Sequence, residues 1–336
     1  MIEAFYRRPS WAIALLTAAA LTVPLTAGAE ETSGAVEEVM VLTPAPPTLP
    51  AFAPWVIAQS RGYYADEGLK VNLMAANGGA VQVAKQVGAG IAIAGSSVGD
   101  APLFLRANGV PIKVVAMLGG RSLMRVVVSA DNEAIQTPKD LKGKTITTSS
   151  YTDSVYYNFL GMMAQYGVKK GDMNIQAAGP NGIWKLFSTG DADAMIAVPD
   201  SMASAVEAGA NVKVFYAEDY FPGLAQAIVA SDQVIKDRPD LVKKIVSATL
   251  RAMKDIMDDP EALAKEFIQV VPSYVGRESY VSEVIMAYAK NVYPGQQVLG
   301  QMDEERLRAL QDFYLKEGLL EKRMPLSDVY TNQFVE

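Results

Sequence analysis

Residues 149–154, SSYTDS, have the residue types and the position expected of a ligand-binding turn. They lie between a strand-like segment, KTITTSS, and a segment with helical spacing of apolar residues. The first N–H groups of a helix have no partner within the helix, so together with the helix dipole they favour an anion. Ser, Thr and Asp are also common helix caps, and capping is compatible with ligand contact. We therefore expect Ser150, Tyr151, Thr152 and Asp153 to contact a ligand.

Serines also follow an apolar, strand-like segment at residues 90–95. The motif GSSVG, residues 95–99, fits the G-x-S-x-G turn that presents a nucleophilic serine in hydrolases. Because the chain contains no histidine, Ser97 has no conventional general base. A glycine-rich turn after a parallel strand presents free backbone N–H groups and hydroxyls to a ligand. We therefore interpret Ser96 and Ser97 as ligand-binding residues.

Four further side chains lie close to the ends of expected elements. Arg121 lies where the first of two lobes is expected to end, and it could bind a carboxylate, sulfonate or phosphate, or form an ion pair between lobes. Trp55 and Trp184 follow loops, where a ring can stack on a ligand or pack in the core. Asp200, in VPDS, could accept a hydrogen bond from a ligand amine or cap the next helix. All four are candidate ligand-binding residues.

The absence of two residue types excludes most catalytic sites. The chain has no cysteine and no histidine. It therefore lacks disulfides, zinc sites with thiolate or imidazole ligands, and the Ser-His-Asp and Cys-His pairs of most hydrolases. We expect no catalytic residue, no metal and no cofactor. The formal net charge is −7 and the basic residues form no stripe or block, so nucleic acid is not an expected partner.

Residues 1–29 have the three parts of a secretory signal peptide. Arg7 and Arg8 supply positive charge, residues 11–25 form an apolar stretch, and the tripeptide AGA gives the small residues of a cleavage site. The apolar stretch is shorter than the roughly 20 residues that a membrane-spanning helix needs. We expect export to the periplasm with cleavage after Ala29.

Strand-like and helical segments alternate along the rest of the chain, which predicts an α/β architecture with parallel sheets covered by helices. Without residues 1–29 the chain is still longer than a single hydrophobic core usually serves, so two lobes are expected. In the helical C-terminal third, an apolar stripe from Leu241 to Met257 indicates packing against a sheet. The expected strands are residues 36–42, 69–76, 90–95, 112–118, a strand that opens at Arg125, and residues 144–150, 172–178, 192–198, 211–217 and 223–231.

Five spaced segments resemble the solute-binding proteins of bacterial ABC importers, in particular the group that handles nitrate, sulfonates, taurine and thiamine-precursor pyrimidines. They are APWVIAQSRGYYADEGLKVNL, VPIKVVAML, TPKDLKGKTITTSS, STGDADAMIAVPDS and LQDFYLKEGLLEKRMPLSDVYTNQF. The resemblance implies that residues 62–71 carry the chain from the first helix around a tight turn into the second strand. Gly68 then supplies the backbone freedom of the turn, while Asp66 and Glu67 are solvated.

The resemblance also implies a type II-like periplasmic binding protein: two lobes, each a mainly parallel sheet flanked by helices, joined by two crossovers at a hinge. Lobe I would comprise residues 30–121 and 222–336, and lobe II residues 122–221. The protein would be a monomer that captures a small molecule in the cleft and delivers it to an inner-membrane ABC permease and its ATPase. We favour a small organic anion, such as a sulfonate or carboxylate, bound by residues 149–154 and Arg121. An aromatic or pyrimidine-like ring is the second choice.

Enzymes also occur on folds similar to this one. The pyrimidine synthases of eukaryotic thiamine biosynthesis and the porphobilinogen-polymerising enzymes depend on histidine or cysteine residues, which this chain lacks. An exported lyase or isomerase that uses Asp100, Asp153 or Asp200 is an alternative, as is a sensory partner of a membrane kinase. The expected function is nevertheless binding without catalysis.

Cleavage of the signal peptide is directly testable. If residues 1–29 are removed on export, the mature protein begins at Glu30, because signal peptidase cleaves after small residues. Expression of the full chain in a double-membraned bacterium, followed by intact-mass measurement of the periplasmic fraction, checks this. Recovery of the uncleaved chain from the membrane fraction would contradict the prediction.

Overall fold

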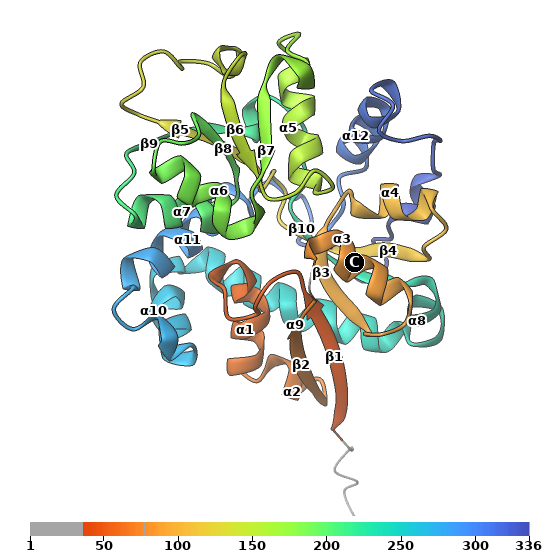
Figure 1. The fold of residues 1–336 in the computed structure, drawn as a ribbon. Helices are drawn as coiled ribbons and strands as arrows, with labels where there is room; N and C mark the ends of the chain where they lie inside the picture. Colours follow the sequence, from red (N-terminus) through yellow and green to blue (C-terminus); the bar gives the residue numbers. More distant parts are fainter. Residues whose placement is uncertain (1–35, 77, 336) are drawn as a thin grey trace, which may run out of the picture. The chain divides into compact units, whose positions relative to one another are not determined.

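Two five-stranded sheets form the framework of the protein, for which a computed structural model describes residues 36–76 and 78–335. The expected signal peptide, residues 1–29, lies outside the described residues. The first sheet has the order β2-β1-β3-β10-β4 and the second the order β7-β6-β8-β5-β9 (Figure 1). The strands of the first sheet are β1 (Glu37–Thr43), β2 (Leu69–Ala75), β3 (Ala94–Val98), β4 (Ile112–Leu118) and β10 (Gln226–Ser231). Those of the second are β5 (Arg125–Ser129), β6 (Thr145–Thr148), β7 (Asn174–Ala177), β8 (Ala194–Ala197) and β9 (Val212–Tyr216).

Each sheet is mainly parallel, as expected, with one strand of opposite direction. In the first sheet β10 runs antiparallel to both of its neighbours, β3 and β4, and in the second sheet β5 runs antiparallel to β8 and β9. The described chain passes from one sheet to the other twice, through residues 119–124 and residues 217–225. We call these segments the first and the second crossover. The two-lobed α/β prediction is thereby confirmed, whereas the exact lobe boundaries stay a prediction.

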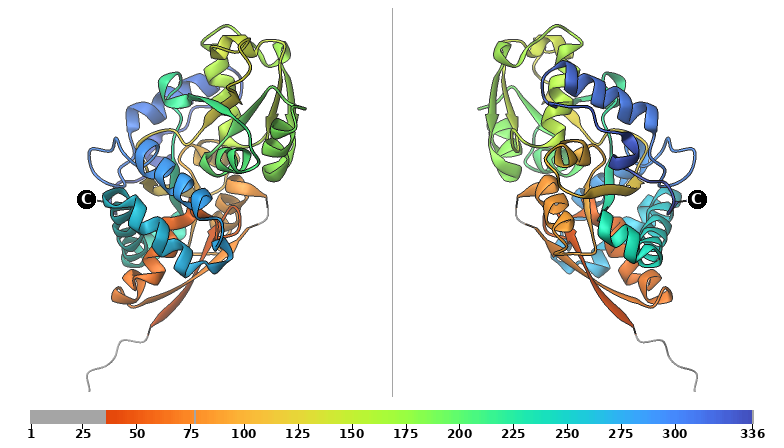
Figure 2. Two further views of the ribbon diagram at one scale, coloured as in Figure 1. Left: turned by 90° about the vertical axis from the view of Figure 1, so that its left-hand side faces the viewer. Right: turned by 90° about the vertical axis from the view of Figure 1, so that its right-hand side faces the viewer.

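Helices flank both sheets (Figures 1 and 2). In the first lobe α3 packs against β1, β3 and β10, and α9 packs against β4 and α1; in the second, α6 packs against β6 and β8. α7 of the second lobe lies against α11 of the first. The helices are α1 (Ala53–Ser60), α2 (Tyr63–Asp66), α3 (Gly79–Gly88), α4 (Ala101–Ala107), α5 (Ser154–Ala164), α6 (Gly179–Ser188), α7 (Pro199–Glu207), α8 (Asp232–Asp237), α9 (Pro239–Asp258), α10 (Pro260–Val270), α11 (Glu278–Asn291), α12 (Glu304–Lys316) and α13 (Leu326–Val329). Single 3-10 turns are η1 (Pro50–Phe52), η2 (Pro138–Leu141), η3 (Lys170–Asp172), η4 (Ala217–Asp219) and η5 (Pro272–Tyr274).

The long helix α9 confirms the packing interpretation of its apolar stripe. Leu241, Ile245 and Met253 are buried, and the helix lies against α1 and β4. After α9, the Asp259 carboxylate accepts a hydrogen bond from the Ala262 N–H at 3.0 Å and Pro260 opens α10. Asp at the cap and Pro in the first turn are the pattern that starts a helix. No helix within the described residues is both long and apolar enough to cross a membrane.

The segment before β2 has the role expected of it, as scaffold. A short helix, α2, precedes Gly68, which has a φ of +73° and leads directly into the strand. This left-handed conformation is strained for residues that have a Cβ, so glycine is required there. Asp66 is exposed and pairs with Arg251 at 3.2 Å, on the outer surface of α9.

A close contact between α5 and the second crossover provides a test of the packing between them. A Cβ on Gly161 of α5 would lie 2.3 Å from two ring carbons of Phe221, which is itself buried and packs on Phe313. We therefore expect Gly161→Ala to destabilise the protein by about 1–2 kcal/mol, because overpacking outweighs the roughly 1 kcal/mol that alanine contributes within a helix. Urea unfolding followed by circular dichroism measures the change. Gly171→Ala is the control, since a Cβ there meets no heavy atom within 4 Å; equal midpoints for the two variants would contradict the packing described.

Candidate ligand-binding site

A cavity of about 270 Å³ lies where elements of the two lobes meet. Residues at or just beyond the carboxyl ends of four parallel strands line it: Ala45 after β1, Val98 at the end of β3, Ser149 after β6 and Val198 after β8. Such ends are the usual ligand sites of open α/β sheets, because the loops there are free to vary without disturbing the sheet. Its volume is near the lower end of the roughly 300–1,000 Å³ typical of small-molecule sites.

Four helices begin at the cavity. Their first residues line it: Gly79 and Ala80 of α3, Ser154 and Val155 of α5, Pro180 and Asn181 of α6, and Asp200 and Ser201 of α7. A helix N-terminus carries partial positive charge from N–H groups without intrahelical partners. Two of these ends, those of α5 and α7, also carry a carboxylate, from Asp153 and Asp200 respectively.

Asp153 precedes α5 and lines the cavity, as expected for a ligand-contacting residue. It does not cap the helix with its side chain; instead its carboxylate accepts a hydrogen bond from the Ser149 hydroxyl. Burial raises the pKa of Asp153, and the Ser149 hydroxyl acts in the opposite direction. The carboxylate therefore has room for a further donor at the cavity wall.

Asp200 connects the two lobes at the opposite helix start. Its carboxylate belongs to α7 of the second lobe and accepts hydrogen bonds from two groups of the first, the Ala51 N–H at 3.2 Å and the Tyr288 hydroxyl at 3.3 Å. Burial raises the pKa of Asp200 to about 6, against the opposing effect of these donors. Neither sequence-based alternative, a cap or a ligand contact, anticipated this contact between the lobes. The N-cap of α7 is Val198, and its N–H donates to the hydroxyl of Ser201 in the first turn at 3.0 Å.

Arg125, the first residue of β5, is completely buried close to Asp200. Its Nε and Nη2 groups have no hydrogen-bond partner within residues 36–76 and 78–335, and its guanidinium lies 5.5 Å from the centre of the Tyr216 ring. Burial lowers the pKa of Arg125, while the nearby Tyr288 and Asp200 favour its charged form. Arg125 does not line the cavity, and among the described residues that do, there is no lysine and no arginine.

Aromatic side chains from both lobes contribute to the cavity walls. Trp184 of α6 lines the cavity and is partly buried, and its stacking on a ligand stays a prediction. Phe52, Tyr280 and Tyr288 face it from the first lobe and are buried. Flat rings on the walls, with polar groups at the helix starts, form a site suited to an aromatic ligand.

Six predicted site residues lie outside the cavity lining: Trp55, Ser96, Arg121, Ser150, Tyr151 and Thr152. Trp55 is fully buried in α1 as part of the core, and its indole N–H has no partner among the described residues. Arg121 lies in the first crossover, where its N–H donates to the Val292 carbonyl at 3.0 Å and its side chain lies against Gly295. Ser96 is fully buried within β3, and its neighbour Ser97 reaches the cavity.

The position of the two serines corrects the strand prediction. The strand occupies Ala94–Val98 instead of residues 90–95, so Ser96 and Ser97 are inside it and pair with Ile228 and Ala227 of β10. The expected free backbone N–H groups of a turn are therefore absent at these two positions. Because side chains alternate across a strand, only Ser97 faces the cavity; its hydroxyl donates to the Ala80 carbonyl at 3.0 Å.

Residues 150–152 form the outer part of the turn before α5. The hydroxyls of Ser150 and Thr152 are 2.9 Å apart and bind each other. The Tyr151 hydroxyl donates to the Ile175 carbonyl at 2.9 Å and accepts from the Ala177 N–H at 3.2 Å, so it covers the edge strand β7. None of the three lines the cavity. Their contact with a ligand stays a prediction.

The sequence analysis missed several cavity residues that lie far apart along the chain. Gln226 of β10 and Tyr280 and Tyr288 of α11 reach the site from elements separated from the other walls by long helical segments. No local motif marks them, since an aromatic residue on an amphipathic helix has the same spacing whether it faces a core or a cavity.

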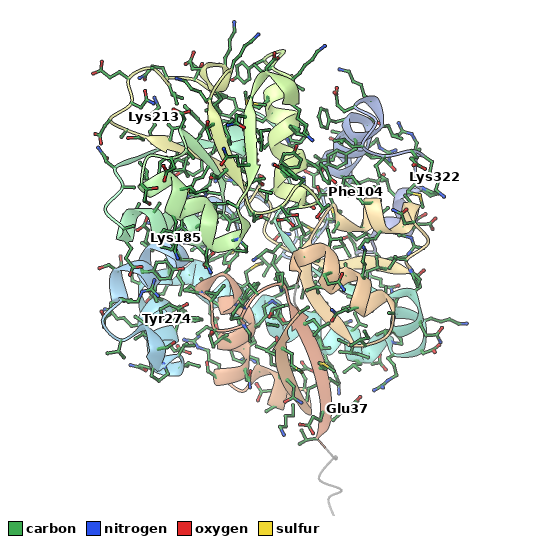
Figure 3. The ribbon with its side chains drawn as sticks, viewed as in Figure 1. Glu37, Phe104, Lys185, Lys213, Tyr274 and Lys322 are labelled. Carbon is green, nitrogen blue, oxygen red and sulfur yellow. The ribbon has the colours of Figure 1, made fainter. Side chains whose placement is uncertain are left out.

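Asp100, named in the enzyme alternative, lies apart from Asp153 and Asp200. It is fully buried, accepts a hydrogen bond from the Tyr314 hydroxyl at 2.6 Å and has a pKa raised by burial. Close by, the ring of Phe104 packs on those of Tyr157 and Tyr314, at centroid distances of 4.9 and 4.8 Å; Figure 3 labels Phe104 where α4 approaches α5 and α12. Asp100 does not line the cavity, and residues 36–76 and 78–335 contain no group of three acidic, His or Cys side chains arranged to hold a metal ion.

Known proteins similar to this chain include both binding proteins and an enzyme. The riboflavin-binding protein RibY of Chloroflexus aurantiacus is 27% identical over 293 residues, 84% of this chain and 82% of that protein. The 4-amino-5-hydroxymethyl-2-methylpyrimidine phosphate synthase of Aspergillus parasiticus is 25% identical over 240 residues, 66% of this chain and 68% of the synthase. Among solved structures, the alkanesulfonate-binding protein SsuA of Xanthomonas axonopodis pv. citri, bound to MOPS, superposes with a TM-score of 0.69 at 17% identity, covering 88% of this chain and 98% of SsuA.

The structural similarity to SsuA supports the periplasmic binding protein fold, with two mixed sheets, each flanked by helices. The family model described as NMT1/THI5 like matches residues 49–263, which include strands of both sheets, both crossovers and most of the cavity walls. The chain therefore belongs to the NMT1/THI5-like family.

Proposed function

We propose that this protein is an exported solute-binding receptor that closes over an aromatic heterocycle carrying N–H donors and delivers it to an ABC permease and its ATPase in the inner membrane. The observation that carries the ligand class is the charge of the cavity: Asp153 and Asp200 line it, and none of its described lining residues is basic. An organic anion, the ligand favoured from the sequence, would face two carboxylates in the lining, and the nearby basic side chain, Arg125, lies behind Asp200 and outside the lining. An N–H group of a bound ligand instead supplies a hydrogen-bond donor, which a carboxylate removed from water requires.

The helix starts refine the ligand class. The positive ends of α5 and α7 already have the carboxylates of Asp153 and Asp200 close by. The start of α6, which has proline and asparagine at the cavity, has no such carboxylate among its first residues, whereas the start of α3 lies against Asp153, whose carboxylate oxygen would be 3.4 Å from a Cβ on Gly79. The start of α6 therefore favours an acceptor such as a ring carbonyl or ring nitrogen. A heterocycle with donors on one edge and acceptors on another can bind both the carboxylates and a helix start that lacks one.

The aromatic walls support a flat ligand. Trp184 comes from the second lobe and Phe52, Tyr280 and Tyr288 from the first, so a ring between them contacts both lobes at once. Only a ligand with greater affinity for the closed arrangement shifts the protein toward closure, and contacts with both lobes provide that difference. The relatives that bind riboflavin or make a pyrimidine phosphate act on rings of this kind. Binding without catalysis is consistent with a chain that has no histidine and no cysteine.

A thermal-shift screen tests the proposed function. We expect riboflavin or an aminopyrimidine to raise the unfolding temperature, with about 2.7 kcal/mol of stabilisation at 100 times the dissociation constant, and alkanesulfonates and nitrate to give no shift. Trp184→Ala should abolish the stabilisation, because the ring loses its stacking partner. Tyr166→Phe is the control, since Tyr166 packs on Tyr220, does not line the cavity and is not a predicted ligand contact. Stabilisation by sulfonates alone, or conversion of the bound compound during incubation, would refute the proposal.

Ionisation of Asp200 makes binding dependent on pH. Its pKa of about 6 in the free protein means that the carboxylate is largely ionised at pH 7.5 and protonated at pH 5. Since a donor group of the ligand favours the ionised form, affinity should be constant above pH 7 and fall as the pH drops through 6, by up to about tenfold per pH unit. Calorimetric titration with the strongest ring compound of the screen, between pH 5 and 8, measures this.

Two variants separate Asp200 from a general effect of acid. Asp200→Asn should flatten the pH profile and weaken binding at pH 7.5, because a hydrogen bond to a charged acceptor contributes about 1.5–3 kcal/mol. Asp191→Asn, an exposed position away from the cavity, should keep the profile of the natural protein. An unchanged profile in Asp200→Asn would remove Asp200 from the site.

A further inference from the structure

The two crossovers lie side by side and exchange hydrogen bonds. The Ala217 N–H of the second donates to the Met124 carbonyl of the first at 3.3 Å, and the Ser122 N–H donates to the Glu218 carboxylate at 2.9 Å. The backbones approach closely: a Cβ on Gly223 would lie 2.4 Å from the Ser122 hydroxyl oxygen. Any rotation of one lobe against the other must change the backbone of these two segments, because the described chain connects the sheets nowhere else.

The guanidinium of Arg306 binds both crossovers at once. Its Nη1 donates to the Gly120 carbonyl of the first crossover at 3.0 Å, and its Nε donates to the Gly223 carbonyl of the second at 2.9 Å. Nη1 also reaches one Glu218 carboxylate oxygen at 3.0 Å, and Nη2 pairs with the other. Glu218 belongs to the second crossover and also accepts a hydrogen bond from the Ser122 N–H of the first. The ion pair of Arg306 and Glu218 therefore also connects the two crossovers.

Arg306 is held by an element that belongs to neither crossover. It lies in the first turn of α12, where its own N–H donates to the Asp303 carboxylate at 3.0 Å. Leu307 and Leu310 of α12 are fully buried, and the Arg306 side chain is only 13% exposed. The Glu218 side chain is 32% exposed, so the pair is partly buried and is screened less by salt than a fully exposed pair. The planar fork of the guanidinium also fixes the direction of each bond, which a lysine does not.

We propose that Arg306 is a hinge clamp: together with Glu218 it fixes the spacing of the two crossovers and restricts the angle between the lobes. The inference rests on the proposed function in one respect, that the lobes move against each other to admit a ligand. Because the donors of one rigid group end on both segments, a change in the spacing of the crossovers breaks at least one of its bonds. Arg306 thereby limits how far the free protein opens and acts on the ligand site without touching the ligand.

The distance between lobes in the ligand-free protein tests the clamp. The chain has no cysteine, so Lys85→Cys on α3 and Lys139→Cys on η2 place one spin label on each lobe, at exposed positions. Pulsed electron spin resonance then gives the distribution of distances between the labels. We expect this distribution to broaden in Arg306→Met and in Glu218→Gln. Arg306→Lys should broaden it as well, because an ammonium group cannot bind both carbonyls and the carboxylate in this arrangement.

A matched control lies two residues away. Arg308→Met removes an exposed arginine of the same helix that pairs with Glu304 within α12, and it should leave the distribution unchanged. Thermal unfolding of every variant shows whether it is folded. If Arg306→Met does not fold, the distance distributions of Arg306→Lys and Glu218→Gln test the clamp. Distributions as narrow as that of the natural protein in these folded variants would overturn the clamp. The distance measurement needs no ligand, so its result does not depend on the outcome of the ligand screen.

Discussion

The carboxylate of Asp200 is the interaction on which the rest of the site depends. Asp200 lies in the first turn of α7 in the second lobe, accepts hydrogen bonds from Ala51 and Tyr288 of the first lobe, and lines the cavity. A desolvated carboxylate is stable only where donors surround it. The same group therefore joins the lobes, and in the function that we propose it favours a ligand that brings donors of its own.

Much of this arrangement could be predicted from the sequence because it follows local rules. The alternation of strand-like and helical segments predicts two α/β lobes, the Asp259–Pro260 pair predicts the start of α10, and Gly68 predicts the turn before β2. Asp153 and Trp184 line the cavity, and both were candidates because Asp153 comes between a strand and a helix and Trp184 comes just after a loop; in a parallel sheet the ends of strands meet at one edge.

The errors have a common physical origin in burial, which a single sequence does not specify. A short apolar segment such as GIAIAGSSV can place its strand at several positions, and the one adopted lets Ser96 and Ser97 pair with β10. Trp55 has the same helical spacing as a cavity residue but lies in the core. The partner of Asp200, Tyr288, lies 88 residues further along the chain, so their contact depends on how α7 and α11 pack together.

The charge of the cavity leads to the most direct test of the account. Native mass spectrometry of the protein purified from the periplasm, followed by denaturation and identification of any released compound, shows what the protein captures. The account predicts a compound with an aromatic heterocycle, N–H donors and no net negative charge. Release of an alkanesulfonate, nitrate or an aliphatic carboxylate would contradict it.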